Sequence, residues 1–237
     1  MRMRPATDDR PKAMVEVAGA PILEHQLRWL AENDVTSVAV SCGYRAEVVE
    51  EFVAGRQGSG LDVVTVLEEE PLGRGGGLRL AAGRLPRPAE AFLALNGDVI
   101  TRCRVEDLIA QHERLGAAAT LVLVRFRTPW AVAELDGDRI LHFEQSPLLP
   151  YWGNSGVYWL EPEVRSLLPA RGDLEETTFP ALARQGRLGA YRFSGYLRCM
   201  DSPKDVAEVS AELMGPQETA NNRAVRRLGD PARSAGA

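Results

Sequence analysis

The sequence has no long apolar run, no surplus of positive charge and few cysteines, and each absence argues against a class of function. No apolar run approaches the ~18 residues of a membrane span, and the first residues lack the apolar core of a signal peptide. Lys and Arg number 28 against 33 Asp and Glu, which argues against a broad nucleic-acid-binding surface. We therefore expect a cytoplasmic protein with no membrane or nucleic-acid partner, whose phosphate sites are local.

The cysteines and glycines exclude further chemistries. Cys42, Cys103 and Cys199 are scattered, without a Cys-x-x-Cys pair or a histidine at metal-ligand spacing, so we expect buried structural thiols. The chain has neither the G-x-G-x-x-G motif of dinucleotide-binding folds nor the P-loop motif. It also has no internal repeat, including the hexapeptide repeat of a left-handed β-helix.

Short Val- and Leu-rich runs alternate with segments of helical period, which is typical of βαβ units in an α/β fold with a mainly parallel sheet. The predicted strands are 35–41, 62–67, 91–95, 119–126, 157–160 and 189–193. The predicted helices are 21–33, 46–54, 75–85, 105–115, 162–168, 178–184 and 203–214. Asp136-Gly137-Asp138 predicts an antiparallel hairpin between runs 132–135 and 139–143. We expect one domain over 1–214 and a disordered tail over 215–237.

Two segments carry side chains suited to phosphate and metal chemistry. Lys12 lies on a loop before a helix, where an ammonium group can reach phosphate oxygens, although a lysine there is more often a solvated surface charge. Asn96-Gly97-Asp98 follows a buried strand, at the edge where open α/β sheets bind ligands. Asp98 is therefore a candidate Mg²⁺ ligand, with ordinary turn formation as the alternative.

A glycine-rich turn joins the strand before Glu68 to the next helix, and it contains Gly73, Gly75, Gly76 and Gly77. Glycines allow the backbone to approach a flat or anionic ligand, and the helix N-terminus offers free N–H groups. A plain turn with a helix cap explains the segment equally well. The turn is therefore a candidate nucleotide site only in combination with other motifs.

Five motifs in order and at family spacing together resemble the sugar-1-phosphate nucleotidylyltransferases over about Arg2 to Met214. The motifs are Pro11-Lys12-Ala13-Met14, the Glu-Pro-Leu-Gly-x-Gly-Gly run from Glu70, Asn96-Gly97-Asp98, Asn154-Ser155-Gly156-Val157-Tyr158 and Ser202-Pro203-Lys204-Asp205. The resemblance implies a Rossmann-like, mixed and mainly parallel sheet with helices on both faces and a small antiparallel sugar-binding part. It implies a nucleoside triphosphate and a sugar 1-phosphate as partners and Mg²⁺ as cofactor. The sugar phosphate attacks the α-phosphorus in line and pyrophosphate leaves.

The resemblance also implies a role for each matching residue. In the catalytic set, Arg2 steadies the triphosphate and the leaving pyrophosphate, Lys12 contacts the phosphates and Asp98 binds magnesium. The implied nucleotide-binding residues are Glu68, Gly73, Gly75, Gly76, Asn96 and Gly97. The implied sugar-binding residues are Trp130, Ala131, Gln145, Asn154 and Ser155, although Trp130 is equally compatible with an anchor of the core. Glu68 and Gly77 favour guanine weakly, because a carboxylate can accept hydrogen bonds from guanine N1–H and N2–H₂.

Three features depart from the family pattern. The first strand and its glycine-rich loop are missing before Arg2; that strand is central in the implied sheet, so we expect the natural start to lie upstream of Met1. Gln145-Ser146-Pro147 replaces the family's Glu-Lys-Pro and removes a positive charge, for which Arg198 is a candidate substitute. Cys199 replaces the second magnesium carboxylate, and a thiol is a poor ligand for a hard cation. Asp201, two residues on, is the candidate replacement metal ligand.

Two other functions stay open at this point. A non-catalytic relative could bind nucleotide or sugar phosphate as a regulatory or partner subunit. A glycosyltransferase of related sheet topology would use Asp136-Gly137-Asp138 as a metal motif, but a hairpin turn explains that run better. The base, the sugar and the oligomeric state are open, and a homo-oligomer is compatible with the sequence.

Overall fold

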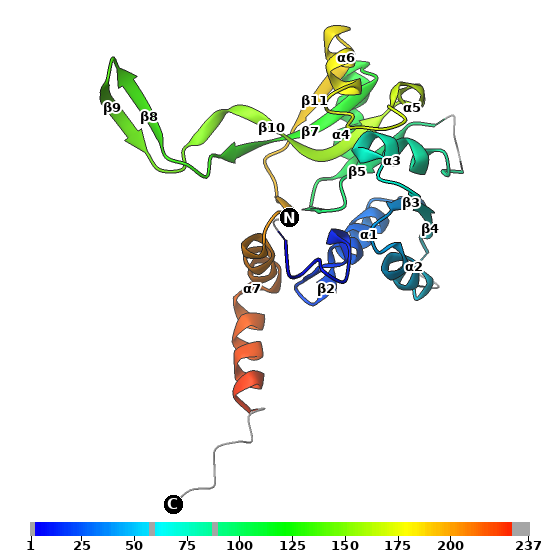
Figure 1. Ribbon diagram of the computed structural model, residues 1–237, viewed down its shortest axis with the longest axis horizontal. Coiled ribbons are helices and arrows are strands. Elements are labelled where there is room, and N and C mark those ends of the chain that lie inside the picture. The colour runs from blue at the N-terminus through cyan, green and yellow to red at the C-terminus, as the bar shows by residue number, and fades with distance from the viewer. Residues whose placement is uncertain (1–2, 57–59, 87–89, 229–237) are drawn as a thin grey trace, which may run out of the picture.

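Helices and strands alternate along the first half of the computed structural model, which describes residues 3–56, 60–86 and 90–228 (Figure 1). The elements of this half are η1 (Lys12–Met14), β1 (Glu16–Val17), β2 (Ala20–Pro21), α1 (Ile22–Glu32), β3 (Ser37–Cys42), α2 (Ala46–Ala54), β4 (Asp62–Leu67), α3 (Gly73–Ala82), β5 (Phe92–Leu95), β6 (Val99–Thr101) and α4 (Val105–Leu115). Those of the second half are β7 (Ala119–Arg127), β8 (Val132–Asp136), β9 (Arg139–Glu144), β10 (Leu148–Leu160), α5 (Val164–Leu167), α6 (Thr178–Arg184), β11 (Leu188–Arg192), β12 (Leu197–Cys199) and α7 (Pro203–Leu228). No helix in the described ranges is long and apolar enough to cross a membrane.

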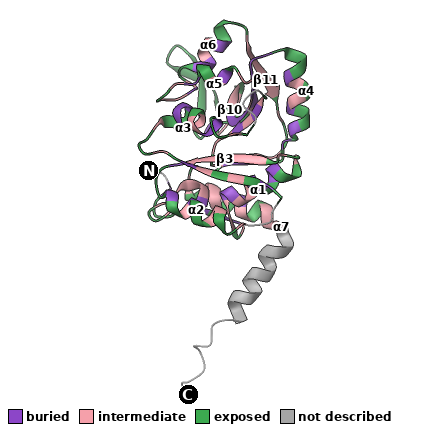
Figure 2. Ribbon diagram, turned by 90° about the vertical axis from the view of Figure 1, so that its right-hand side faces the viewer, coloured by how far each residue is buried: buried purple, intermediate pink, exposed green. Residues whose placement is uncertain are grey.

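The central sheet has the strand order β11-β7-β10-β5, in which β11 runs parallel to β7 while β10 is antiparallel to both β7 and β5. A second, two-stranded sheet pairs β3 with β4 in parallel. Helices α3, α5 and α6 pack on the larger sheet, and α1 and α2 pack beside β3 and β4 (Figure 1). Several helices carry buried and exposed residues on different sides (Figure 2), as expected for helices that cover a sheet.

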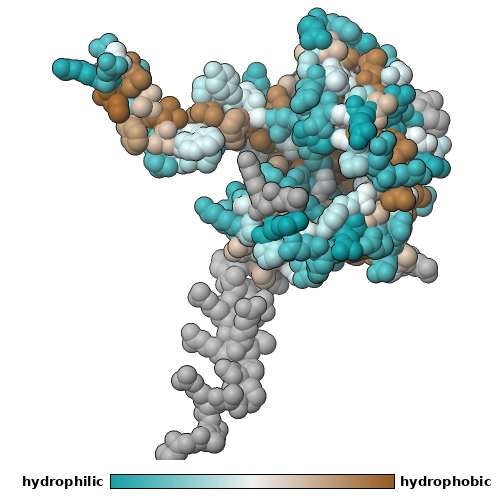
Figure 3. Space-filling view, in the orientation of Figure 1, coloured by the Kyte–Doolittle hydropathy of each residue, from teal (hydrophilic) through white to brown (hydrophobic). Residues whose placement is uncertain are grey.

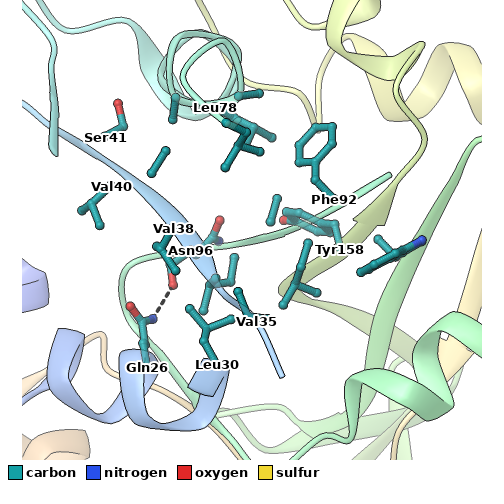
Figure 4. A pocket seen from close by; sticks show the side chains of 18 of the residues that line it. Gln26, Leu30, Val35, Val38, Val40, Ser41, Leu78, Phe92, Asn96 and Tyr158 are labelled. Carbon is teal, nitrogen blue, oxygen red and sulfur yellow. Dashed lines mark hydrogen bonds between the residues drawn. The ribbon is translucent and has the colours of Figure 1, made fainter. Parts of the chain in front are cut away.

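A cavity of about 1230 Å³ separates the two sheets. Its walls include the consecutive residues 33–41 on one side and 90–98 on the other. Side chains of a strand alternate between its two faces, so consecutive lining residues mean that the backbone edges of β3 and β5 border the cavity. Figure 4 shows Val35, Val38 and Val40 on one side and Phe92 on the other. In the described residues no strand lies between these two edges.

Most predicted elements are confirmed, and the main differences have identifiable causes. The strand predicted at 157–160 is the end of β10, which begins at Leu148. The rest of β10 could not be predicted because proline and glycine usually interrupt a strand, and this segment contains Pro150, Gly153 and Gly156. Register shifts between Leu148 and Trp152 and between Asn154 and Tyr158 accommodate these residues. The short strands β1, β2, β6 and β12 carry too few residues to show a period.

Helix α7 differs from the prediction in its length. Helical geometry is interrupted at Gly215, with φ 66° and ψ 173°, one residue after the predicted end at Met214. Helix assignment then resumes and continues to Leu228. The assignment of 1–214 to one domain and of 215–237 to a disordered tail stays a prediction.

Candidate active site

Three charged side chains from distant parts of the chain converge beside this cavity. Lys12 begins η1, Asp98 follows β5, and Asp201 lies between β12 and α7. The Lys12 ammonium donates to Asp98 Oδ2 at 2.5 Å and to Asp201 Oδ1 at 2.8 Å. Because both oxygens contact the same nitrogen, the two carboxylates are within about 5.3 Å of each other. The sequence-based prediction that Asp201 can reach the position beside Asp98 is compatible with this geometry.

The charges at this point stabilise one another. Desolvation disfavours the charged form of Lys12, but the hydrogen bonds that its ammonium donates to Asp201 and Asp98, together with the charges of these carboxylates, outweigh it, so the pKa of the Lys12 ammonium is raised. The side chains of Lys12, Asp98 and Asp201 are 32%, 24% and 62% exposed, so a ligand can approach from solvent. Lys12 thus remains a cation between two carboxylates at neutral pH.

Cys199 occupies the place where the resemblance implies a carboxylate, and its thiol does not replace one. Cys42 and Cys103 are buried as predicted, but Cys199 is exposed, so the prediction of a buried thiol is wrong at this position. Desolvation of the Cys199 sulfur, followed by the negative charges of Asp98 and Asp201, raises the pKa of the thiol to about 11. Its Sγ lies 3.9 Å from the Ser155 carbonyl oxygen. A neutral thiol is not a ligand for Mg²⁺, so the sequence-based inference that Cys199 cannot serve is physically consistent.

Asp98 and Asp201 fit a hard divalent cation. Two carboxylates close together supply the oxygen ligands that Mg²⁺ prefers, and the remaining positions of its octahedron are usually filled by water and substrate phosphates. Within the described ranges no group of three His, Cys, Asp or Glu side chains converges on one point. A cation here would therefore depend on substrate oxygens for part of its coordination.

Glu68 follows β4 and is held in a fixed position at the cavity wall. Its Oε1 accepts from Ser41 Oγ at 2.7 Å and its Oε2 accepts from the Leu72 amide at 3.2 Å. A Cβ on Gly77 would lie 2.5 Å from Glu68 Oε1, so the glycine makes room for this carboxylate. Glu68, Gly73 and Gly77 all line the cavity. Gly77, noted in the sequence only as an extra glycine, is thus coupled to Glu68.

The predicted role of the first turn of α3 as a site of free N–H groups is wrong. The amides of Gly75 and Gly76 donate to the Gly172 carbonyl at 2.9 and 3.3 Å, and the Arg74 amide donates to Asp173 Oδ1 at 2.9 Å. A Cβ at Gly73 or Gly75 would lie 2.9 Å or less from atoms of residues 169–172. These glycines therefore allow a second loop to pack closely on the helix N-terminus. Their contact with a nucleotide remains a prediction.

The Asn96-Gly97-Asp98 turn is fixed by buried polar contacts. The Gln26 amide donates to the carbonyls of Asn96 and Val99 at 2.8 and 2.9 Å, and the first of these bonds is drawn in Figure 4. The Asn96 amide donates to the Gly156 carbonyl at 2.8 Å. Gly156, at φ 80°, approaches the Asn96 side chain so closely that a Cβ would lie 2.6 Å from its Nδ2. The turn that presents Asp98 is thereby held on both sides.

The predicted sugar-binding residues fall into two separate groups. Asn154 and Ser155 belong to β10: Asn154 Nδ2 donates to Tyr158 Oη at 2.9 Å, and the buried Ser155 hydroxyl donates to the Val122 carbonyl at 2.7 Å. Trp130 and Ala131 precede β8 and Gln145 follows β9, away from the residues that line the cavity. Trp130 is 74% exposed, so its interpretation as a core anchor is wrong.

Two further predicted residues have a simple outcome. Arg2 lies outside the described residues. Arg198 donates to Glu208 and also pairs with Glu212, at 3.0 and 3.2 Å. Its charge is therefore neutralised within the protein, which argues against Arg198 as the substitute for the missing lysine.

Comparison with known proteins places this site in a family. Residues 1–195 match the family model described as nucleotidyl transferase. The chain belongs to that family. The resemblance to sugar-1-phosphate nucleotidylyltransferases deduced from the five motifs is confirmed at this level, and the parallel and antiparallel pairings of the sheets agree with the predicted mixed α/β fold.

Two relatives illustrate the similarity of sequence. The mannose-1-phosphate guanyltransferase of Candida albicans is 34% identical over 214 residues, which cover 86% of this chain and 59% of that protein. The mannose-1-phosphate guanyltransferase beta-A of Xenopus laevis is 32% identical over 212 residues, with the same two coverages. The chain thus spans about three fifths of the length of these curated relatives.

A solved structure supports the fold of the family. HddC from Yersinia pseudotuberculosis, crystallised with GMP-PN, superposes with a TM-score of 0.69 at 20% identity, covering 90% of this chain and 94% of that one. At this identity the likeness shows the fold alone. The Rossmann-like α/β architecture predicted from the motifs is therefore confirmed.

Sequence analysis missed three residues that shape the site. Gln26 is an ordinary polar residue on the buried side of α1, and Ser41 is a small residue at the end of β3. Arg74 lines the cavity and pairs with Asp173 and Glu175 at 2.9 and 3.0 Å. A polar residue at an apolar helical position is the one signal that could have identified Gln26, because a buried amide needs hydrogen-bond partners.

Proposed function

We propose that this chain transfers a nucleotidyl group from a nucleoside triphosphate to a sugar 1-phosphate and releases pyrophosphate. The observation that supports it best is the convergence of Lys12, Asp98 and Asp201 beside a cavity that Glu68 also borders. Membership of the nucleotidyl transferase family and the names of the two relatives support the same reaction.

The residues suggest a division of labour. The sugar phosphate oxygen forms a bond to the α-phosphorus, the bond from that phosphorus to the bridging oxygen breaks, and pyrophosphate leaves. Asp98 and Asp201 would hold Mg²⁺, which supplies charge neutralisation on the phosphates when bound. Lys12 would turn from the carboxylates toward phosphate oxygens, and this exchange adds a mobile positive charge where negative charge develops. Arg2 would add a second positive charge at the leaving pyrophosphate.

We infer guanine as the base. Glu68 keeps its carboxylate at the cavity wall with one hydrogen bond to each oxygen, which leaves lone pairs free to accept from N1–H and N2–H₂ of guanine. Gly77 provides the space that this orientation requires. The two relatives are named guanyltransferases, and HddC was crystallised with a guanine nucleotide analogue.

For the sugar, we propose that Asn154 and Ser155 contribute from β10. The Ser155 carbonyl oxygen lies 3.9 Å from Cys199 Sγ, and the next residue, Gly156, packs against the Asn96 side chain. Trp130, Ala131 and Gln145 could contribute only if the segments that carry them move toward the cavity. The relatives suggest mannose 1-phosphate as the first sugar phosphate to test.

The test is pyrophosphate release with Mg²⁺, each common nucleoside triphosphate and a panel of sugar 1-phosphates. We expect release with GTP and one sugar phosphate, and a loss of at least about a hundredfold in Asp98→Asn and in Asp201→Asn, as expected when charge stabilisation is removed. Cys199→Ser is the matched control at the neighbouring position and should retain turnover. Loss of activity in Cys199→Ser but not in Asp201→Asn would contradict the assignment of the metal ligand.

A folded protein that binds GTP or sugar phosphate and releases no pyrophosphate would identify the alternative, a non-catalytic binding relative. Binding is measured by calorimetry on the same sample, so that the two outcomes are separated in one experiment. Release with another triphosphate would retain the transferase and refute only the role of Glu68 in selecting guanine.

A further inference from the structure

A patch of basic and aromatic side chains lies where β7, β10 and β11 run side by side, close to the point where the hairpin of β8 and β9 leaves the sheet (Figure 1). Figure 3 shows hydrophilic and hydrophobic residues together in this region. Trp152 of β10 pairs with Arg125 of β7. Arg192, which ends β11, pairs with Leu123 of β7. Because cross-strand partners and residues two apart on a strand project from the same face, Arg125, Trp152 and Arg192 share one face of the sheet.

The indole ring of Trp152 holds both guanidinium groups. The guanidinium carbons of Arg125 and Arg192 lie 5.6 and 5.4 Å from the centroid of this ring, within the ~6 Å of a cation–π contact. A guanidinium over an aromatic ring still presents N–H groups at its edge to other partners. The two cations are consequently held no more than about 11 Å apart.

The protein does not compensate the charge of these two arginines. Both are exposed, and among the residues that the structure describes neither forms an ion pair. Arg125 donates one hydrogen bond, from Nε to the Leu149 carbonyl at 3.1 Å. Since each guanidinium carries five N–H donors, most donors of the pair are available to a ligand. An anion bound between them would also relieve the repulsion of the two like charges.

The patch lies one sugar length from the proposed acceptor site. Asn154, which we propose for the sugar, lies two residues from Trp152 on β10 and pairs with the same Leu123 as Arg192. Residues two apart on a strand are separated by about 6.8 Å. In a hexose the anomeric oxygen and a substituent on carbon 6 are five bonds of ~1.5 Å apart, on the order of 6 Å in space. A sugar that contacts Asn154 can therefore reach the patch with one of its ends.

The direction of β10 decides which end of the sugar faces the patch. The Asn96 amide donates to the Gly156 carbonyl at 2.8 Å, so the chain after Asn154 leads toward the turn that presents Asp98. Trp152 lies in the opposite direction along the strand from Asn154. The reacting phosphate on carbon 1 has to face Asp98 in the proposed reaction. The end of the sugar remote from carbon 1 therefore faces Trp152 and its two arginines.

We propose that Arg125 and Arg192, held by Trp152, bind a negatively charged group at the end of the acceptor sugar that is remote from carbon 1. The acceptor is then a sugar 1-phosphate with a carboxylate or a second phosphate on carbon 6 or beyond, because guanidinium groups match the oxygens of both anions. A neutral hexose 1-phosphate would leave both cations without a partner. This inference rests on the proposed nucleotidyl transfer and names the class of its acceptor.

The test is calorimetric titration of the 237-residue chain in the presence of Mg²⁺ with three probes, which are mannose 1-phosphate, mannose 1,6-bisphosphate and mannuronic acid 1-phosphate. We expect at least one of the two probes with a second acidic group to bind with a dissociation constant about tenfold lower than that of mannose 1-phosphate at low salt, and the difference to shrink as salt is added. Arg125→Gln with Arg192→Gln should bring the three constants within about threefold of one another. The probe that binds more tightly identifies the anion as a carboxylate or a phosphate.

Arg114→Gln with Arg139→Gln is the matched control, because it removes two positive charges from exposed positions at the end of α4 and at the tip of the β8–β9 hairpin. It should leave the preference for the acidic probe unchanged, which separates a local site from the overall charge of the protein. Circular dichroism verifies that both variants are folded. Equal binding of the three probes by the parent chain would overturn the proposal. So would a preference that survives Arg125→Gln with Arg192→Gln, or one that disappears in the control.

Pyrophosphate release on the same samples separates this inference from the proposed function. Release with GTP and mannose 1-phosphate, without tighter binding of either acidic probe, would refute the anion subsite and retain the nucleotidyl transfer. Tighter binding of an acidic probe that depends on Arg125 and Arg192, without release from any nucleoside triphosphate, would retain the subsite and refute the transfer.

Discussion

Replacement of Lys12 by methionine should strengthen the binding of a divalent cation in the absence of substrate. The lysine ammonium now occupies the space between Asp98 and Asp201, at 2.5 and 2.8 Å from their oxygens. A metal ion at these carboxylates has to displace the ammonium or bind beside it. Methionine has a similar length and no charge, so it removes the competitor and leaves both ligands in place.

The size of the effect follows from the distances and the exposure. At about 4 Å, two unit charges interact by ~1 kcal/mol in a medium as polar as water and by more in the protein. The three side chains are 24 to 62% exposed, so the lower figure applies. A doubly charged ion gains about 1–2 kcal/mol when the ammonium is removed, which corresponds to a dissociation constant roughly 5- to 30-fold lower.

The assay is titration of Mn²⁺ followed by electron paramagnetic resonance, with Mg²⁺ competition. Lys204→Met is the matched control, because that lysine is 82% exposed and, among the residues that the structure describes, pairs only with Glu208, at 3.6 Å. It should leave the constant unchanged, while turnover should fall in Lys12→Met alone. Unchanged or weaker Mn²⁺ binding in folded Lys12→Met would refute the assignment of Asp98 and Asp201 as one metal site.

Two further predictions concern the cavity and its wall. Gly77→Ala adds a Cβ 2.5 Å from Glu68 Oε1. It should raise the KM for the nucleotide by about tenfold while the fold stays intact, because a hydrogen-bonding group is displaced. An unchanged KM would show that Glu68 does not take part in base recognition. Gly73→Ala places a side chain on a residue with φ 77° and brings its Cβ to 2.9 Å from the Gly172 backbone. Urea unfolding should show a free energy of unfolding lower by about 1–3 kcal/mol. An unchanged free energy of unfolding would contradict this packing.

The sequence was most informative where chemistry requires a particular residue type in a short turn. Lys12 and Asp98 could be identified because each lies in a motif whose spacing is local, and Asp201 could be proposed because it is two residues from the substituted position. The occupied amides at the start of α3 could not be foreseen, since their partner, Gly172, is about a hundred residues away and no local pattern links them. For the same reason Gln26 was missed: its partners lie in another turn.

The cap of α7 explains how a carboxylate displaced by two positions can still reach the site. The pairing of β12 with β6 ends at Cys199, and the Met200 amide then donates to the Asp98 carbonyl at 3.0 Å, so the chain stays beside Asp98 after the strand ends. Asp205 Oδ2 next accepts from the Asp201 amide and from Ser202 Oγ, at 3.0 and 2.8 Å. These bonds turn the backbone into the helix, as in other capped helices. If the strand continued, residue 201 would lie on the same face as residue 199 but farther along, at a different distance from Asp98. The strand instead ends at the cap, which directs the Asp201 carboxylate to Lys12.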